Sequence, residues 1–186
     1  MGKESGNIKA ENILRASEGF YQLAKYAIDK LEVANERWYE YLPVAAVNTS
    51  FCIELLLKAI LVLKNKILHI HDLKKLFENL AKEDRVEIDR RLRIIRNSKD
   101  AYNGRGFTYM TFYKNQSLII NLSDTQENLT QLFEIHRETF VKFRYIFEQD
   151  DTLVKYHFEG EVLLDLIEVL RTYAKERCSL TKEIPD

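Results

Sequence analysis

Residues 44–65, VAAVNTSFCIELLLKAILVLKN, lie in the most hydrophobic segment of the chain and decide its fold class. Apolar side chains cover nearly every face of a helix built on this stretch, except for a stripe of Ser50, Glu54 and Lys58. A helix that is apolar on most sides is buried, so we predict that it is the central element of a helical bundle. The polar residues within the stretch argue against a membrane span. Pro43 suits the first turn, where a missing N–H is tolerated.

Hydrophobic periodicity on both sides of this stretch predicts further amphipathic helices. Ahead of it, apolar residues recur every seven positions from Ile13 onwards, which is typical of a long helix packed in a bundle. Behind it, Asp72 can accept a hydrogen bond as the N-cap of a short helix. The predicted helices are residues 7–38, residues 43–65, two shorter helices within 72–103, and two C-terminal helices within 125–178, at about 125–148 and 158–177.

Helical periodicity stops between residues 104 and 123. The run FTYMTFYKNQSLIINL, residues 107–122, is rich in aromatic and β-branched residues around a Lys-Asn-Gln-Ser turn. It is either a small β-hairpin insertion near 106–122 or an extended loop. The whole pattern predicts an all-α fold, an up-down bundle of about five to six helices that forms a single domain over residues 1–186. A chain of this length needs no metal or disulfide to support its core.

The composition is globular, with 46% hydrophobic and 31% charged residues. A formal net charge of -1 provides no global attraction to nucleic acids or membranes, although basic residues dominate 58–99 and acidic residues dominate 148–168. Cys52 and Cys178 lack metal-ligand spacing, and the absence of a cysteine framework fits a reducing compartment. The N-terminal sequence lacks the apolar stretch of a secretory signal. We therefore expect a cytoplasmic protein that needs no membrane, metal or cofactor.

Two charged residues interrupt the central helix. Glu54 and Lys58 form an i,i+4 pair in the favourable order. Because burial of a lone charge is costly, they either line a cleft or an interface, or form a thin solvent-facing stripe. His69 and His71 could chelate a metal on a strand, but the remaining ligands of a metal site are missing. His136 falls on the apolar stripe of its own helix, so we predict a hydrogen-bonded core histidine.

Arginines crowd one of the shorter helices, at Arg90, Arg91, Arg93 and Arg96. Guanidinium groups grip phosphate oxygens in pairs, and neighbouring side chains could stack on single-stranded bases. These neighbours are Arg105, Phe107, Tyr109, Phe112 and Tyr113. In the alternative interpretation, which we favour, the aromatic residues pack on the bundle and nearby acids neutralise the helix. These acids are Asp84, Glu87 and Asp89.

Two longer motifs carry a resemblance. The first, SFCIELLLKAILVLKNKILHIHDLKKLFENL, is a long central helix followed by a loop and a helix start, with Glu54, Lys58, His71, Asp72 and Leu73 as its matching positions. The second is HRETFVKFRYIFE, with Phe140, Arg144, Tyr145 and Glu148. Together they resemble the HEPN superfamily, helical bundles of prokaryotic toxin–antitoxin, phage-defence and RNA-processing proteins. We expect Arg144, Tyr145 and Glu148 on the face of their helix opposite Phe140.

The resemblance implies a compact bundle that forms a homodimer through its helical faces, and often cleaves RNA without a metal in the dimer cleft. That activity belongs to an arginine separated from a histidine by four to six residues. In this chain no arginine has a histidine at that spacing. Arg96 is followed by the polar Asn97, but Tyr102 stands where the histidine is expected. The resemblance therefore supports the fold and the dimer more directly than it supports catalysis.

The leading hypothesis is a homodimer that binds RNA or nucleotides, with weak or absent ribonuclease activity, as a toxin–antitoxin or phage-defence component. Its candidate catalytic residues are Arg144, Glu148 and Arg96. Its candidate substrate-binding residues are Glu54, Lys58, His71, Asp72, Tyr145, Asn97 and Tyr102. The arginines would stabilise a pentavalent phosphate, and Glu148 or His136 would accept the proton. The alternative is a non-catalytic protein–protein interaction module whose acidic C-terminal helices bind a cognate partner protein.

Overall fold

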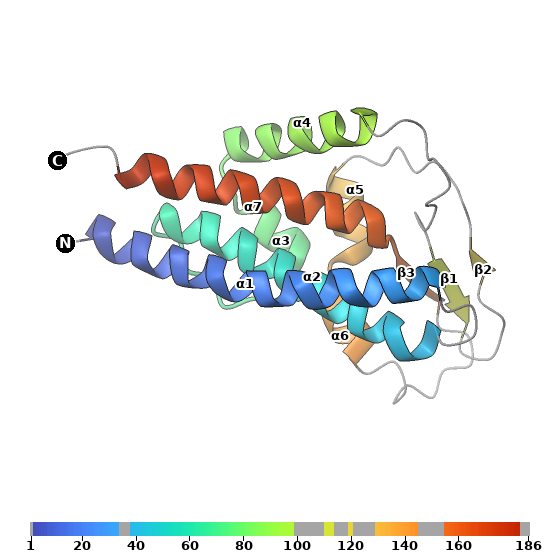
Figure 1. The fold of residues 1–186 in the computed structure, drawn as a ribbon. Coiled ribbons are helices and arrows are strands. Elements are labelled where there is room, and N and C mark those ends of the chain that lie inside the picture. Colours follow the sequence, from blue (N-terminus) through green and yellow to red (C-terminus); the bar gives the residue numbers. More distant parts are fainter. Residues whose placement is uncertain are drawn as a thin grey trace.

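The computed structural model describes residues 2–33, 38–98, 110–113, 119–120, 129–144 and 155–182. Over these residues the protein is a bundle of seven helices with a small sheet at one end, and the start of α1 and the end of α7 lie at the other end (Figure 1). The helices are α1 (Gly2–Val33), α2 (Trp38–Leu63), α3 (Leu73–Glu78), α4 (Lys82–Ser98), α5 (Leu129–His136), α6 (Thr139–Arg144) and α7 (Gly160–Lys182). The predicted all-α helical bundle is confirmed.

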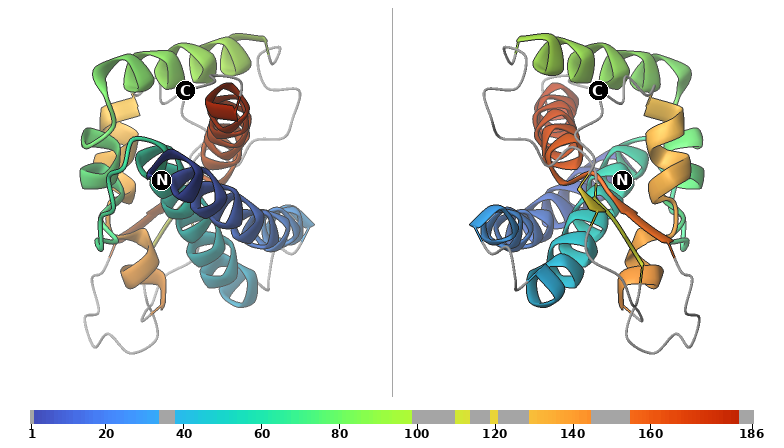
Figure 2. Two further views of the ribbon diagram at one scale, coloured as in Figure 1. Left: turned by 90° about the vertical axis from the view of Figure 1, so that its left-hand side faces the viewer. Right: turned by 90° about the vertical axis from the view of Figure 1, so that its right-hand side faces the viewer.

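The central position of α2 follows from its composition. Helices α1, α3, α6 and α7 all pack on it, and the end-on views show it inside the bundle (Figure 2). Leu42, Ile53, Leu56 and Leu57 of this helix are fully buried. Residues 40–63 are long and apolar enough to cross a membrane by length and composition, but most of that window is buried within the bundle, as in a core helix.

The boundary between the first two helices differs from the prediction. α1 ends at Val33, whereas the predicted helix continued to residue 38, and α2 already begins at Trp38. Pro43 therefore lies inside α2 and not in its first turn. A proline at this position removes one backbone hydrogen bond, and complete burial of Leu42 one residue earlier offsets that loss. The prediction failed because it took the proline as the start of the helix, while packing of apolar residues extends the helix in the N-terminal direction to Trp38.

The predicted helix over 125–148 is two helices within the described residues. α5 ends at His136 and α6 begins at Thr139, with a turn at Arg137 and Glu138 between them. The carbonyl of Arg137 accepts a hydrogen bond from the backbone N–H of Leu73, at 3.2 Å. This N–H is at the first residue of α3 and has no acceptor within its own helix. This tertiary contact overrides the continuous hydrophobic periodicity of the segment.

The sheet has the strand order β2-β1-β3, with both pairs antiparallel. β1 (Met110–Tyr113) and β2 (Ile119–Ile120) lie within the predicted hairpin segment and pair through Met110 with Ile120. The sequence did not predict β3 (Lys155–Phe158), which adds a third strand on the other side of β1. Of the segment 104–123, only these two strands belong to the described residues.

Helices α4 and α6 lie on opposite sides of the bundle. α4 packs on α7, while α6 packs on α2 (Figures 1 and 2). Residues carried by these two helices are therefore separated by the core, and this separation decides which of the candidate residues come together.

Candidate functional site

Glu54 is the centre of the polar cluster on α2. Its residue is 1% exposed, so the interpretation as a solvent-facing stripe is wrong for this side chain. Its Oε1 accepts a hydrogen bond from Lys58 Nζ at 2.8 Å, one helical turn away. Nδ1 of His71 lies 3.0 Å from Oε1 and 3.1 Å from Oε2 of the same carboxylate. Two partners thus compensate the burial of one charge.

His71 connects this buried carboxylate to the surface. It lies in the loop before α3, and its side chain is 62% exposed, against 2% for Glu54. A carboxylate can only accept hydrogen bonds, so Nδ1 carries the proton in this contact and Nε2 of a neutral ring is left as an acceptor. Nε2 points away from Glu54 on an exposed ring, where solvent or a ligand can reach it.

Phe140 of α6 lies against His71, and Arg144 of the same helix lies over Phe140. The rings of Phe140 and His71 stack with centroids 6.2 Å apart and planes at 18°. The guanidinium carbon of Arg144 lies 6.0 Å from the Phe140 centroid, in cation–π range. On the other side Phe140 packs on Phe51 of α2, with ring centroids 5.6 Å apart. The expectation that Arg144 faces away from Phe140 is wrong, because residues four apart share a helix face.

Five residues therefore form one candidate site, which we call the Glu54 cluster: Glu54, Lys58, His71, Phe140 and Arg144. All five were candidate or motif residues from the sequence, drawn from two motifs far apart in the chain. Phe51 was missed, although its place one turn before Glu54 is a signal that it borders the same face.

Asp72, a predicted ligand-binding residue, supports the fold beside His71. Its Oδ1 accepts a hydrogen bond from the Lys75 N–H at 3.0 Å as the N-cap of α3, as predicted. Its Oδ2 accepts one from Arg137 at 2.7 Å. Burial alone would raise the pKa of Asp72, but the Lys75 amide and the Arg137 guanidinium outweigh it and hold this pKa below the usual aspartate value.

Arg96 and Asn97 do not join the Glu54 cluster. Both lie on α4, which packs on α7 on the far side of the core from α6. Tyr102, Tyr145 and Glu148 lie outside the described residues, so their place in the site stays a prediction.

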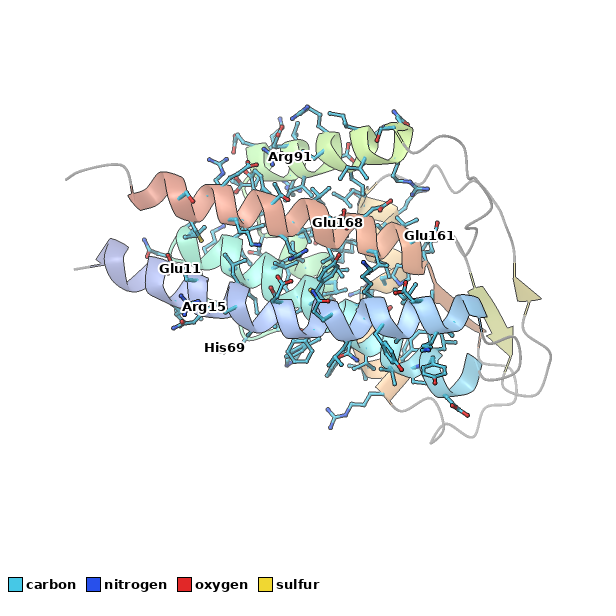
Figure 3. The ribbon with its side chains drawn as sticks, in the orientation of Figure 1. Glu11, Arg15, His69, Arg91, Glu161 and Glu168 are labelled. Carbon is cyan, nitrogen blue, oxygen red and sulfur yellow. The ribbon has the colours of Figure 1, made fainter. Side chains whose placement is uncertain are left out.

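Arg90, Arg91 and Arg93 of α4 are paired with acids, which agrees with the part of the favoured interpretation that concerns Glu87 and Asp89. The packing of the aromatic residues stays a prediction. Glu87 accepts hydrogen bonds from Arg90 and Arg91, and these bonds lower the pKa of Glu87 to about 2. Arg93 bonds to Asp89 on the same helix. In Figure 3 Arg91 lies on α4 at one edge of the molecule, while His69, two residues before His71, lies at the opposite edge.

A second buried carboxylate, Asp84, stabilises the packing of α4. It is fully buried and accepts hydrogen bonds from Lys64 after α2 and from Tyr173 and Arg177 of α7, the last two at 2.6 and 3.2 Å. Burial would raise the pKa of Asp84, but the Lys64 and Tyr173 hydrogen bonds and the charges of Lys64 and Arg177 lower it below its ordinary value. We call these four residues the Asp84 cluster.

His136 is a core histidine, as predicted. It is 1% exposed, its Nδ1 lies 3.1 Å from Thr139 Oγ1, and burial lowers its pKa to about 3. A proton acceptor must reach its substrate, so this histidine cannot fill that role in the described fold.

Metal binding finds no support in the described part of the chain, where no group of three His, Cys, Asp or Glu side chains is placed to hold an ion.

The HEPN domain family model matches residues 10–140. The chain belongs to the HEPN family. The match includes Glu54, Lys58, His71 and Phe140, while Arg144 lies four residues beyond its end. No curated protein and no solved structure matches the chain. The family assignment confirms the resemblance drawn from the two sequence motifs.

Proposed function

We propose that this HEPN protein binds RNA or a nucleotide at the Glu54 cluster. The observation that carries the proposal is the contact between a buried carboxylate and an exposed imidazole: Glu54 holds Nδ1 of His71, whose side chain is 62% exposed, so Nε2 is the ring nitrogen available to a ligand. Carboxylates that accept a hydrogen bond from one ring nitrogen of a histidine, and so orient the ring, occur in many catalytic and binding sites. A core histidine such as His136, which is 1% exposed, cannot be reached by a ligand in this way.

The neighbours of His71 suit a phosphate-containing ligand. Lys58 and Arg144 supply two cationic groups, and arginine matches phosphate oxygens with paired donors. The stacked rings of His71 and Phe140 provide an apolar surface beside these charges. The combination of cations and aromatic rings is the chemistry that single-stranded nucleic acids and nucleotides require.

Cleavage of RNA at this site would use His71 in place of the usual family histidine. Nε2 would take the proton of a 2′-hydroxyl, the 2′-oxygen would attack the adjacent phosphorus, and the bond to the 5′-oxygen would break as water protonates the leaving oxygen. Arg144 would stabilise the pentavalent phosphate, with Glu148 as a second proton acceptor. Because the chain lacks the arginine–histidine spacing of active members, we propose that this activity is weak or absent.

A homodimer is part of the proposal, since HEPN domains commonly dimerise. The proposal includes a role in toxin–antitoxin or phage-defence systems, which the HEPN family membership supports. Light scattering at micromolar concentration should give twice the chain mass of 22.0 kDa. A constant mass near that of one chain would contradict the dimer.

The binding proposal is tested with a fluorescently labelled single-stranded RNA and two matched variants. His71→Gln should weaken binding by about tenfold or more, because the oriented imidazole is lost. His69→Gln replaces an exposed histidine of the same loop and should bind as the wild type does. Equal loss in both variants, or loss in neither, would contradict the site.

Turnover is tested separately with the same RNA and an Arg144→Ala variant. If the protein cleaves, this variant should lose most of its turnover, because the guanidinium stabilises the transition-state charge. Equal turnover by both proteins would remove Arg144 from the mechanism.

The interaction-module alternative gains less support from α7. Glu168 accepts a hydrogen bond from Tyr21, and Glu176 accepts two from Arg91, so these acids are engaged within the fold. A pulldown that recovers a stoichiometric protein partner with no RNA would still favour this alternative.

A further inference from the structure

The segment between α5 and α6 is held against the start of α3 by Arg137. Its carbonyl oxygen accepts the N–H of Leu73, at an N···O distance of 3.2 Å. Its guanidinium Nη2 donates to Oδ2 of Asp72 at 2.7 Å, while Oδ1 of the same carboxylate caps α3 through Lys75. The backbone and the side chain of one residue thus fix the two residues that directly follow His71.

We call the contacts of Arg137 with Asp72 and Leu73 the clamp. Both segments that form it, the turn after α5 and the start of α3, are adjacent in sequence to residues of the Glu54 cluster. His71 precedes the clamped Asp72, and Phe140 follows Arg137 by three residues. The stacking of Phe140 on His71 and the position of Arg144 over Phe140 depend on where α6 lies. The clamp acts on this position together with the packing of α6 on α2. α6 has only six residues, so tertiary contacts and not its own hydrogen bonds determine its position.

Resting on the proposed function, we infer that Arg137 is a positioning residue that sets the distance and ring orientation between His71 and the Phe140–Arg144 pair. It acts through Asp72 and Leu73 and does not touch the ligand. The turn between α5 and α6 is part of the clamp, because the Arg137 carbonyl accepts the Leu73 N–H directly after the end of α5. Sites whose groups must meet within a fraction of an ångström lose function when such a supporting contact relaxes.

The test compares variants of the whole chain by NMR of the His71 ring protons, with His71→Gln to assign the signals. Arg137→Gln removes the charged clamp. Asp72→Asn keeps a good helix cap but removes the carboxylate partner of Arg137. Lys74→Met is the control, because it breaks the Lys74–Glu134 ion pair between α3 and α5 and removes neither the Asp72 nor the Leu73 contact of Arg137. Glu134 keeps its own contact with Arg137 in this variant.

We expect the His71 signals of both clamp variants to move toward those of Phe140→Leu, which lacks the stacked ring, while Lys74→Met leaves them in place. RNA affinity should fall by about tenfold in the clamp variants and remain unchanged in the control. Arg137→Lys should restore part of both properties, since lysine still pairs with Asp72. A protein that merely needs Arg137 for stability would show no such change in the folded His71 signals.

Unchanged His71 signals in both clamp variants would overturn the inference, and so would shifted signals with unchanged RNA affinity. If Arg137→Gln does not fold, Asp72→Asn alone decides. Failure of the wild type to bind RNA would remove the proposed function, whereas the His71 signals would still report whether Arg137 positions the ring. The two failures are therefore distinguishable.

Discussion

Glu54 and Asp84 are both buried carboxylates on helices of one bundle, yet they end in different surroundings. Asp84 is bonded to Lys64, Tyr173 and Arg177, which join α4 to α7 and to the end of α2. Glu54 is bonded to Lys58 and to a ring that is 62% exposed. A buried charge always requires partners, so burial alone does not mark a functional site. The distinguishing property is that one of the partners of Glu54 keeps a second reactive nitrogen at the surface.

The largest expected effect is on stability, at the Asp84 cluster. Asp84→Ala should lower the free energy of unfolding by about 3 kcal/mol, because it removes the buried carboxylate to which Tyr173, Lys64 and Arg177 all donate. Urea denaturation measures this loss, with Glu83→Ala as the control at an exposed acid of the same turn. RNA affinity of the folded variant should not change. A loss no greater than that of the control would remove the contrast between the two clusters.

The next effect is on binding, at the Glu54 cluster. Glu54→Gln keeps the shape of the side chain but removes the charge that orients His71, so RNA affinity should fall by about tenfold. The free energy of unfolding should fall by only about 1 kcal/mol, since an amide still accepts hydrogen bonds. Titration of labelled RNA and urea denaturation measure the two quantities. Unchanged RNA affinity with a large loss of stability would mean that Glu54, like Asp84, stabilises the fold and does not contribute to binding.

The pH dependence of the free energy of unfolding gives a further test of the stabilising role of Asp84. The pKa of folded Asp84 lies below its ordinary value of 3.8, so the unfolded chain binds more protons in acid. Its stabilising contribution is present above that value and is lost as the pH falls through the lower, folded pKa. The slope reaches at most about 1.4 kcal/mol per pH unit for one carboxylate. Urea denaturation across this range should show a shallower acid loss in Asp84→Asn than in the wild type, and identical slopes would contradict the assignment.

The smallest effect concerns the salt dependence of RNA binding. Arg144→Gln should reduce the slope of log affinity against log salt by about one, as expected for the loss of one phosphate contact. Arg93→Gln, an exposed arginine paired with Asp89 on α4, should leave the slope unchanged. Fluorescence anisotropy across a salt series compares the two. A change in both would mean that the basic face of α4 also contacts RNA.

The sequence predicts the core of this fold well, because the apolar pattern of α2 leaves a bundle as the one arrangement that buries it. It fails where tertiary contacts compete with local signals. Pro43 lies inside a helix because Leu42 is buried before it, and the segment around Arg137 is broken because Leu73 needs its carbonyl. The hydrophobic periodicity of the sequence shows neither the burial of Leu42 nor the hydrogen bond from Leu73.

The site is predictable in part for the same reason. The i,i+4 rule brings Glu54 and Lys58 together, and the same rule applied to Phe140 and Arg144 would have corrected the face assigned to that arginine. The contact of Glu54 with His71 depends on the course of the loop between α2 and α3. Arg96 illustrates the opposite case, since its chemistry suits phosphate but α4 carries it to the far side of the core.

The most direct test of the central claim is a double-mutant cycle on RNA affinity with Glu54→Gln and His71→Gln. If Glu54 acts by orienting His71, the double variant should bind no more weakly than His71→Gln alone, because the carboxylate has nothing left to orient. Losses that add in full, or no loss in any of the three variants, would contradict the claim that these two residues form one site.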